Sequence, residues 1–372
     1  MIEFIDLKSQ YRRHKVEIDE RIQRVLIHGQ FIMGPEIQEL ESWLAEYIGV
    51  KHCISVSSGT HSLEIALRAL NIGFGDEVIT VPFSWISSAE VISLVGATPV
   101  FVDIVADTYT MDPAKLELAI TSKTKAIIPV SMFGQLPDME AINYIAAKHK
   151  IPVIEDGAQS LGATRNGKKS CGTSLIGSTS FFPAKPLGCY GDGGALFTDD
   201  DTVANNIRAI RTHGGLVRHH HTHVGTNGRM DTLQAAIVMA KVPYFEEEII
   251  ARELIGAKYS ELLRAHVAVP QIGVGNTHVY AQYTVAVKPE KRSIIQDFLK
   301  AKGIPTGIYY PKCFHEQPVF QHLGYIKGDF PVSELASHGV LSLPMHPYLS
   351  NEDLEMITRS LIEAVGAETI LI

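Results

Sequence analysis

Short apolar runs alternate with amphipathic segments along the first two thirds of the chain. Residues 36–47 carry apolar side chains at helical spacing, and a regular succession of strand and helix patterns follows them. Alternation of this kind is typical of parallel strands joined by crossover helices. The predicted strands are 53–56, 78–81, 99–102, 126–130, 152–155, 178–182 and 194–197, and the predicted helices between and after them are 62–70, 87–94, 113–120, 139–149 and 202–212.

The pattern changes after about residue 240. Residues 245–266 resemble one long, highly charged helix, and 279–287 alternate as an antiparallel strand does. Two further helices are predicted at 293–302 and 351–365. We therefore expect a large α/β domain over 1–245 and a smaller C-terminal α+β domain over 246–372, a division that also suits the length of 372 residues.

Composition narrows the class of protein. The chain has 41 acidic and 33 basic residues, a net charge of −8, which argues against a general nucleic-acid binder. The apolar stretch 91–102 is interrupted and too short to span a bilayer, and the first residues lack a secretion-signal pattern. The four cysteines are scattered without zinc-ligand spacing, so no metal site is predicted. The expectation is a cytoplasmic protein that binds neither nucleic acid nor membrane.

In open parallel sheets, ligands bind beyond the carboxyl ends of the strands. Asp156 directly follows the predicted strand 152–155, where a carboxylate could bind a metal, accept a proton, hold a cationic ring nitrogen or only cap the loop. Lys185 follows the strand 178–182 between two prolines, which restrict the backbone. Desolvation there could free the amine for a Schiff base, although a surface lysine in a turn is the simpler alternative. A lysine together with a carboxylate is what pyridoxal phosphate (PLP) requires.

An ordered set of motifs resembles the DegT/DnrJ/StrS sugar aminotransferases over nearly the whole chain. Besides the segments around Asp156 and Lys185, the matching motifs lie at 4–7, 34–36, 57–60, 75–79, 191–194, 227–231 and 343–346. The resemblance implies the aspartate-aminotransferase-like fold (PLP fold type I), with a mostly parallel seven-stranded sheet in the large domain. It also implies a PLP-dependent transaminase.

The resemblance assigns roles around the cofactor ring. Lys185 would hold PLP as a Schiff base and shuttle protons, and Asp156 would pair with the pyridinium nitrogen. Gln159 would lie near the ring hydroxyl. Trp85 would stack on the face of the pyridine, unless it is an ordinary core aromatic.

The phosphate end has its own set of residues. Gly59 and Thr60 would bind the phosphate at the start of the helix that follows, whose N-terminus favours an anion. Ser180 would add a second hydroxyl. Asn227 would reach the phosphate of the neighbouring subunit's cofactor, which implies a homodimer with shared active sites. The glycine-rich segment 188–194 lacks nucleotide-loop spacing and is predicted to be a turn that lets the lysine loop fold back.

Four residues are candidates for contacts with the substrate. Arg229 could hold a substrate anion, unless it forms a structural ion pair with Asp231. Tyr310, His315 and His346 could contact the substrate from the side of the small domain. The histidine cluster 219–223 is predicted to be a mobile loop near the substrate rather than a metal site, because consecutive histidines do not readily converge on one ion.

The reaction implied by the resemblance is amination of a nucleotide-linked ketosugar, with L-glutamate as donor and 2-oxoglutarate as co-product. The chain most resembles the branch that aminates UDP-2-acetamido-2-deoxy-3-oxoglucuronate for surface polysaccharides. Tyr309 replaces a histidine of that branch, and Lys312-Cys313 replaces an Ile-Pro pair. Two alternatives are a PLP-dependent sugar dehydratase and a regulator that binds PLP or a sugar nucleotide without turnover. The lysine at 185 and the absence of clustered cysteines favour transamination over the dehydratase, and the set of Asp156, Gln159 and Lys185 argues against the regulator.

Overall fold

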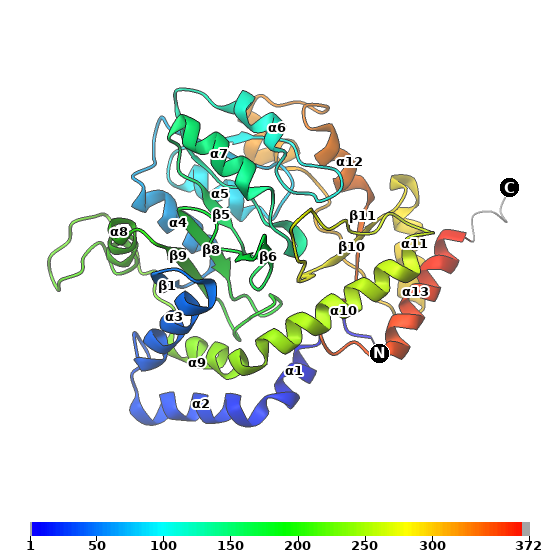
Figure 1. Cartoon of the computed structure of the whole chain (residues 1–372), viewed down its shortest axis with the longest axis horizontal. Coiled ribbons are helices and arrows are strands. Elements are labelled where there is room, and N and C mark those ends of the chain that lie inside the picture. Colours follow the sequence, from blue (N-terminus) through cyan, green and yellow to red (C-terminus); the bar gives the residue numbers. More distant parts are fainter. Residues whose placement is uncertain (1, 367–372) are drawn as a thin grey trace.

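The computed structural model describes residues 2–366, and its central layer is built from the strands that the apolar runs predict (Figure 1). These strands are β1 (His52–Val56), β2 (Glu77–Thr80), β3 (Thr98–Phe101), β4 (Thr124–Ile127), β5 (Ile154–Asp156), β8 (Ile176–Ser180) and β9 (Gly194–Thr198). They form one sheet of order β1-β9-β8-β5 and another of order β3-β2-β4.

Most of the pairing is parallel, and one strand is reversed. β2 runs parallel to β3 and β4, and β5 runs parallel to β8, whereas β9 is antiparallel to both β1 and β8. Isolated parallel bridges Ile127–Val153 and Val130–Asp156 join the β4 side to the β5 side. The strands expected in one sheet are thus found in two sheets that meet through these bridges.

Helices cover both faces of this layer. Helices α4 (Gly59–Ala69), α5 (Ser87–Leu94) and α8 (Asp201–Arg211) share one buried cluster with the strands. A larger cluster on the other face contains residues of α3 (Pro35–Ile48), α7 (Met139–His149) and α9 (Thr232–Lys241). The predicted helix 113–120 is shorter than expected: α6 (Pro113–Leu116) continues only as a 3₁₀ turn to Ala119, because Ile120 adopts an extended backbone.

The C-terminal part has its own buried cluster. It is formed by α10 (Phe245–Leu263), β10 (Tyr283–Ala286), α11 (Arg292–Ala301), β11 (Val340–Leu343) and α13 (Asn351–Gly366), and Ile2 packs into it from the other end of the chain. β10 and β11 are antiparallel. The predicted strand 279–287 is wrong at its start, since Tyr280 has φ of 45°, outside the β region.

Four helices, one hairpin and the strand β11 were not predicted. The helices are α1 (Leu7–Arg13), α2 (Lys15–His28), α9 and α12 (Pro331–Gly339), and the hairpin is β6 (Thr164–Arg165)–β7 (Lys168–Lys169). α12 lies near the larger core cluster, because Ala336 belongs to it. Among residues 2–366, no helix is both long enough and apolar enough to cross a bilayer.

Candidate active site

Asp156 is the last residue of β5 and lies almost fully buried at the carboxyl end of the sheet. Its Oδ2 accepts a hydrogen bond from Ser88 Oγ (2.7 Å), and its Oδ1 accepts one from the backbone N–H of Ala158 (3.2 Å). Burial raises the pKa of Asp156, while these hydrogen bonds and the positive charge of Lys185 act in the opposite direction. The site therefore holds one acidic group in a desolvated position.

Lys185 lies in the loop between β8 and β9, and its electrostatic partner is Asp156. The loop folds back on itself as predicted, since Phe181 N–H donates to Gly193 O and Cys189 N–H donates to Phe181 O, both at 2.8 Å. Burial lowers the pKa of Lys185, and the carboxylate of Asp156 partly opposes that effect. A lysine whose pKa is lowered has its lone pair free more often, as a Schiff-base nucleophile requires.

Helix α4 begins earlier than predicted, at Gly59 rather than at residue 62. Gly59 and Thr60 therefore lie in its first turn, where backbone amides have no intrahelical acceptor and favour an anion. A Cβ atom on Gly59 would lie only 2.6 Å from Cβ of Ser180, so these two predicted phosphate residues are in direct contact. Thr60 Oγ1 is hydrogen-bonded to Ser87 Oγ at 2.6 Å.

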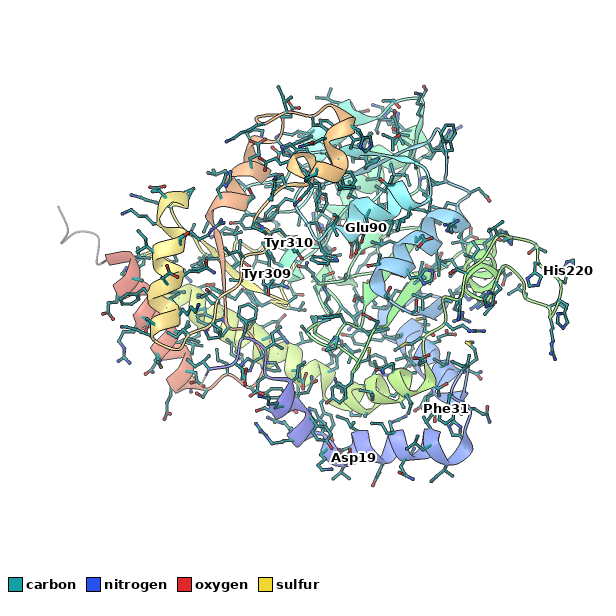
Figure 2. All side chains as sticks on the ribbon, turned by 180° about the vertical axis from the view of Figure 1, so that it is seen from behind. Asp19, Phe31, Glu90, His220, Tyr309 and Tyr310 are labelled. Carbon is teal, nitrogen blue, oxygen red and sulfur yellow. The ribbon has the colours of Figure 1, made fainter. Side chains whose placement is uncertain are left out.

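Gln159 and Tyr310 meet although they are far apart in the chain. Gln159 Oε1 accepts from the backbone N–H of Phe133 (2.8 Å), and its Nε2 donates to the Tyr310 hydroxyl (3.3 Å). The Tyr310 ring centroid lies 6.1 Å from that of Trp85, which is 58% exposed and thus not an ordinary core aromatic. Figure 2 shows Tyr310 beside Tyr309, in the middle of the molecule.

These residues fit PLP. Because a side chain at Gly59 would overlap Ser180, the first turn of α4 is bare at this position, and this bare helix N-terminus forms a cradle that suits a phosphate. Asp156 offers a buried carboxylate for a cationic ring nitrogen, and Lys185 offers an amine within its electrostatic reach. The exposed indole of Trp85 offers a flat surface for a ring.

Arg229 does not form the ion pair that was its alternative role. Among residues 2–366 it has no carboxylate partner, and its Nε is buried without a hydrogen-bond partner. A guanidinium left unpaired in this way is available for a ligand anion. Asn227 is exposed, and its neighbour Gly228 accepts a hydrogen bond from Ser57 N–H at 2.9 Å. The expected contact of Asn227 with the phosphate of a neighbouring subunit's cofactor stays a prediction.

The two histidines lie elsewhere. His315 is buried against Phe330, and its Nε2 lies 3.0 Å from Glu334 Oε1. His346 is buried as well, in the electrostatic reach of Arg252 and Asp6. Within residues 2–366, no contact of either histidine involves Lys185, Asp156 or Gln159. Their roles as substrate contacts stay predictions, and the structure gives them other neighbours.

The histidine cluster belongs to a loop that projects from the body of the molecule after α8. Figure 2 shows His220 on this projection, far from Tyr310. In the part of the chain that the structure describes, no group of three or more histidine, cysteine, aspartate or glutamate side chains could hold a metal ion.

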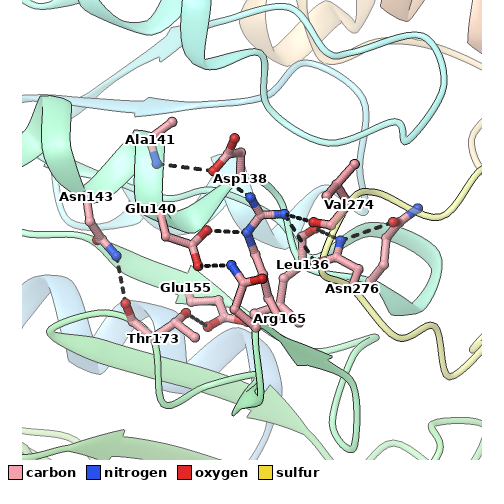
Figure 3. A network of polar contacts seen from close by, with 12 residues as sticks. Leu136, Asp138, Glu140, Ala141, Asn143, Glu155, Arg165, Thr173, Val274 and Asn276 are labelled. Carbon is pink, nitrogen blue, oxygen red and sulfur yellow. Dashed lines mark hydrogen bonds and ion pairs between the residues drawn. The ribbon is translucent and has the colours of Figure 1, made fainter.

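Sequence reasoning missed Glu155, the neighbour of Asp156. Its buried carboxylate accepts from four donors: Ser131 Oγ (2.9 Å), Ser170 Oγ (2.6 Å), Cys171 N–H (2.9 Å) and Thr173 Oγ1 (2.9 Å). Figure 3 shows the bond from Thr173 and the polar contacts around Arg165, which link α7 to the segment near Asn276. Because adjacent strand residues point to opposite faces, Glu155 anchors the strand while Asp156 faces the site. No spacing signal distinguishes the two acids.

Comparison with known proteins agrees with this geometry. Residues 12–362 match the model of the DegT/DnrJ/EryC1/StrS aminotransferase family. A UDP-2-acetamido-2-deoxy-3-oxo-D-glucuronate aminotransferase from Pseudomonas aeruginosa is 52% identical over 97% of this chain and 99% of that protein. A UDP-N-acetyl-3-dehydro-alpha-D-glucosamine 3-aminotransferase from Acidithiobacillus ferrooxidans is 40% identical over 96% of each chain.

The fold has solved counterparts. The crystal structure of NtdA from Bacillus subtilis with bound cofactor PMP superposes with a TM-score of 0.89 at 31% identity, covering 95% of this chain and 82% of that one. The sequence match thus agrees with the fold and with the residues found at the carboxyl edge of the sheet. The chain belongs to the DegT/DnrJ/EryC1/StrS aminotransferase family.

Proposed function

We propose that this protein transfers an amino group from L-glutamate to a UDP-linked 3-keto sugar or uronate, with PLP as cofactor, in the synthesis of an amino sugar for surface polysaccharide. The buried carboxylate of Asp156 within electrostatic reach of Lys185 carries this proposal, because PLP chemistry requires a lysine together with a carboxylate. The choice of a UDP-linked 3-keto substrate is supported by the two relatives described above, which act on such sugars.

Lys185 and Asp156 do the central work in this proposal. Bound PLP supplies an electron sink for the carbon from which a proton is removed. Lys185 Nζ would take that proton and return it to the carbon on the other side of the transferred nitrogen. Its lowered pKa suits an amine that must act as a base near neutral pH. Asp156 would keep a positive charge on the ring nitrogen. Because its carboxylate is buried, the electrostatic attraction between the two groups is stronger than it would be in water.

The other predicted residues bind and orient. Gly59, Thr60 and Ser180 hold the phosphate, and Trp85 covers one face of the ring. Gln159 faces the ring hydroxyl, where its amide is fixed by Phe133 and Tyr310. Arg229 holds an anionic group of the substrate with its unpaired guanidinium.

Several features of the whole molecule belong to the same proposal. We assign residues 1–245 to a large PLP-binding domain and 246–372 to a smaller domain, of which 367–372 lie outside the described residues. The separate buried cluster around β10 and β11 supports this division. The active unit is a homodimer with shared active sites in the cytoplasm. The seven strands of the large domain form two sheets that meet through the isolated bridges near Asp156.

A two-step assay tests the function. First, the purified holoenzyme is mixed with L-glutamate, and the absorption of the bound cofactor should change from its aldehyde form to its amine form with release of 2-oxoglutarate. Second, the amine form is offered a panel of UDP- and dTDP-linked 3-keto and 4-keto sugars, and the amino sugar is detected by mass spectrometry. We expect the UDP-linked 3-keto sugars to react fastest. Failure of every ketosugar after a successful first step would refute the substrate and leave the cofactor assignment intact.

The same assay separates the alternatives. A dehydratase would consume the sugar without retaining nitrogen in the product, and a regulator would bind the sugar nucleotide but leave glutamate unchanged.

The panel of ketosugars should pair each uronate with the sugar that lacks the carboxylate. Tyr309, the residue that departs from the branch, lies beside the site, with its ring centroid 5.8 Å from that of Tyr310. The difference in rate between each uronate and the matching sugar without a carboxylate therefore decides whether the substrate is a uronate.

A further inference from the structure

Ser88 is buried in the second position of α5 and has no role in the function proposed above. Its Oγ lies 2.7 Å from Asp156 Oδ2, the shortest contact that this hydroxyl makes. The other two, to Ser84 Oγ (3.3 Å) and the carbonyl oxygen of Trp85 (3.4 Å), are longer. The bond spans 68 positions in the sequence, so it connects α5 to the end of β5.

The chemistry of these groups fixes the direction of the bond. A serine hydroxyl has one proton, and an ionised carboxylate can only accept. Ser88 therefore donates to Asp156, and its oxygen remains free to accept from Ser84. Hydrogen bonds to an ionised group are stronger than neutral ones and favour the charged form. The bond thus acts against the burial that disfavours a charge on Asp156.

The same turn of α5 reaches both ends of the cofactor cradle. Ser87 Oγ bonds to Thr60 Oγ1 at the phosphate end, and Ser88 Oγ bonds to Asp156 at the ring-nitrogen end. Trp85, whose indole is exposed, precedes Ser87 by two residues and Ser88 by three. A rigid helix start that carries both serines can hold the distance between the two ends.

We propose that Ser88 is a positioning residue that orients the carboxylate of Asp156 and keeps it ionised against the ring nitrogen of PLP. Among residues 2–366, Asp156 accepts from one other donor, the N–H of Ala158, so without Ser88 its Oδ2 would have no hydrogen-bond donor from this part of the chain. The titratable groups that influence Asp156 from the surrounding elements are Lys185, Tyr310 and Cys171. This inference rests on the PLP assignment but not on the identity of the ketosugar.

An isosteric pair of variants provides the test. Ser88→Thr keeps the hydroxyl, and Ser88→Val has nearly the same shape without it. Ser93→Ala, which removes an exposed hydroxyl from the same helix, is the control. Each holoenzyme is titrated between pH 5 and pH 10 while the absorption of the lysine-linked cofactor is recorded, and PLP dissociation is measured by equilibrium dialysis.

We expect the valine variant to raise the midpoint of the cofactor titration by about half a unit or more, because a ring nitrogen that loses its proton no longer lowers the basicity of the lysine-linked nitrogen. PLP should bind several-fold more weakly, and kcat for the glutamate half-reaction should fall by about tenfold, with KM changed less. The threonine variant should resemble the parent. A valine variant whose titration and PLP affinity match those of Ser93→Ala would overturn the proposal, and so would a threonine variant as impaired as valine. These readouts use no ketosugar, so they stand even if the proposed substrate fails.

Discussion

The amine of Lys185 has two separable properties, its positive charge and its ability to lose a proton. Arginine keeps the charge and much of the length but does not deprotonate in proteins, so Lys185→Arg separates them. We predict that this variant binds no PLP covalently and loses roughly 10²- to 10⁴-fold in rate, the range that a positioned acid–base group contributes. Borohydride reduction followed by intact-mass measurement detects the covalent link.

The matched control for that experiment is Lys168→Ala, which removes an exposed lysine from the hairpin β6–β7. It should retain both the cofactor mass after reduction and the parental rate. A reduced Lys185→Arg protein that still carried the mass of the cofactor would place the link on another lysine, and the mechanism proposed for residue 185 would be wrong.

Substitutions of the adjacent carboxylates Asp156 and Glu155 should affect different properties, activity in the first case and stability in the second. Asp156→Asn keeps the shape of the side chain but removes the charge opposite the ring nitrogen, so it should fold normally and lose activity. Glu155→Gln places an amide where four donors converge, so it should cost about 1–3 kcal/mol of stability through unsatisfied buried groups. Thermal unfolding and the cofactor spectrum, measured on both variants, distinguish the roles. An Asp156→Asn protein with full activity, or a Glu155→Gln protein of parental stability, would contradict this division.

At the scale of elements, one carboxylate ties α12 to the end of β3. Asp103 Oδ1 accepts from the backbone N–H (2.9 Å) and the hydroxyl (2.6 Å) of Ser333, and its Oδ2 accepts from Val332 N–H (3.1 Å). Lys115 Nζ lies 3.2 Å from the same Oδ2. A carboxylate that satisfies the free amides of a helix start acts as a cap supplied from another element.

The pKa of Asp103 gives this cap a pH dependence. Burial by itself would raise the pKa, but the hydrogen bonds from Ser333, Ile104 and Val332 lower it below the usual aspartate value. Because the folded-state pKa is the lower one, the stabilisation is complete above the ordinary value of about 3.9 and is lost as the pH falls through the folded value. We predict that Asp103→Asn lowers the unfolding free energy at pH 7 by about 1–3 kcal/mol. The difference from the parent should shrink below about pH 4; a difference independent of pH would show that the charge is not involved.

The elements also show what sequence reasoning can reach. The strands of the central layer were predicted because buried parallel strands are short continuous apolar runs, and α5 and α7 were predicted with their observed bounds. Lys185 and Asp156 were identified because each follows such a run. The bond of Ser88 to Asp156 was not, since its partners lie 68 positions apart and a serine near a helix start has many ordinary reasons to be there. The late start of β10 depends on the backbone of Tyr280, which no alternation of side chains reveals.

At the scale of the whole molecule, the site combines both parts of the chain. Tyr310 comes from the C-terminal part and reaches Gln159 beyond β5, and Phe314 N–H donates to Pro82 O (2.8 Å) at the end of β2. On the other side, the loop after α8 projects from the body (Figure 1). The chain returns from this loop through Asn227, which is exposed and forms a bridge to Thr212. The loop exposes Leu216, Val217 and Val224, which are 61%, 66% and 85% accessible. Apolar side chains on a projection are what a contact with a second copy of the chain would cover.

A complementation experiment tests whether the active sites are shared. Lys185→Ala removes the amine, and Asn227→Asp places a negative charge where a phosphate is expected, so each variant alone should be nearly inactive. If Asn227 serves the neighbouring subunit, every mixed dimer has one site with both changes and one site with neither. After subunit exchange at equal concentrations, half of the dimers are mixed, so about a quarter of the parental activity should return.

The control for complementation is a mixture of Lys185→Ala with Asp156→Asn, two residues that act on each other within one chain. Each site of that mixed dimer retains one defect, so no activity should return. If Asn227 instead served the cofactor of its own chain, the first mixture would behave like the control, because each site would again carry one change. Size-exclusion chromatography of the mixtures must show dimers in both cases. An absence of rescue then means that Asn227 does not act on the neighbouring subunit's cofactor, and not that the mixed dimers failed to form.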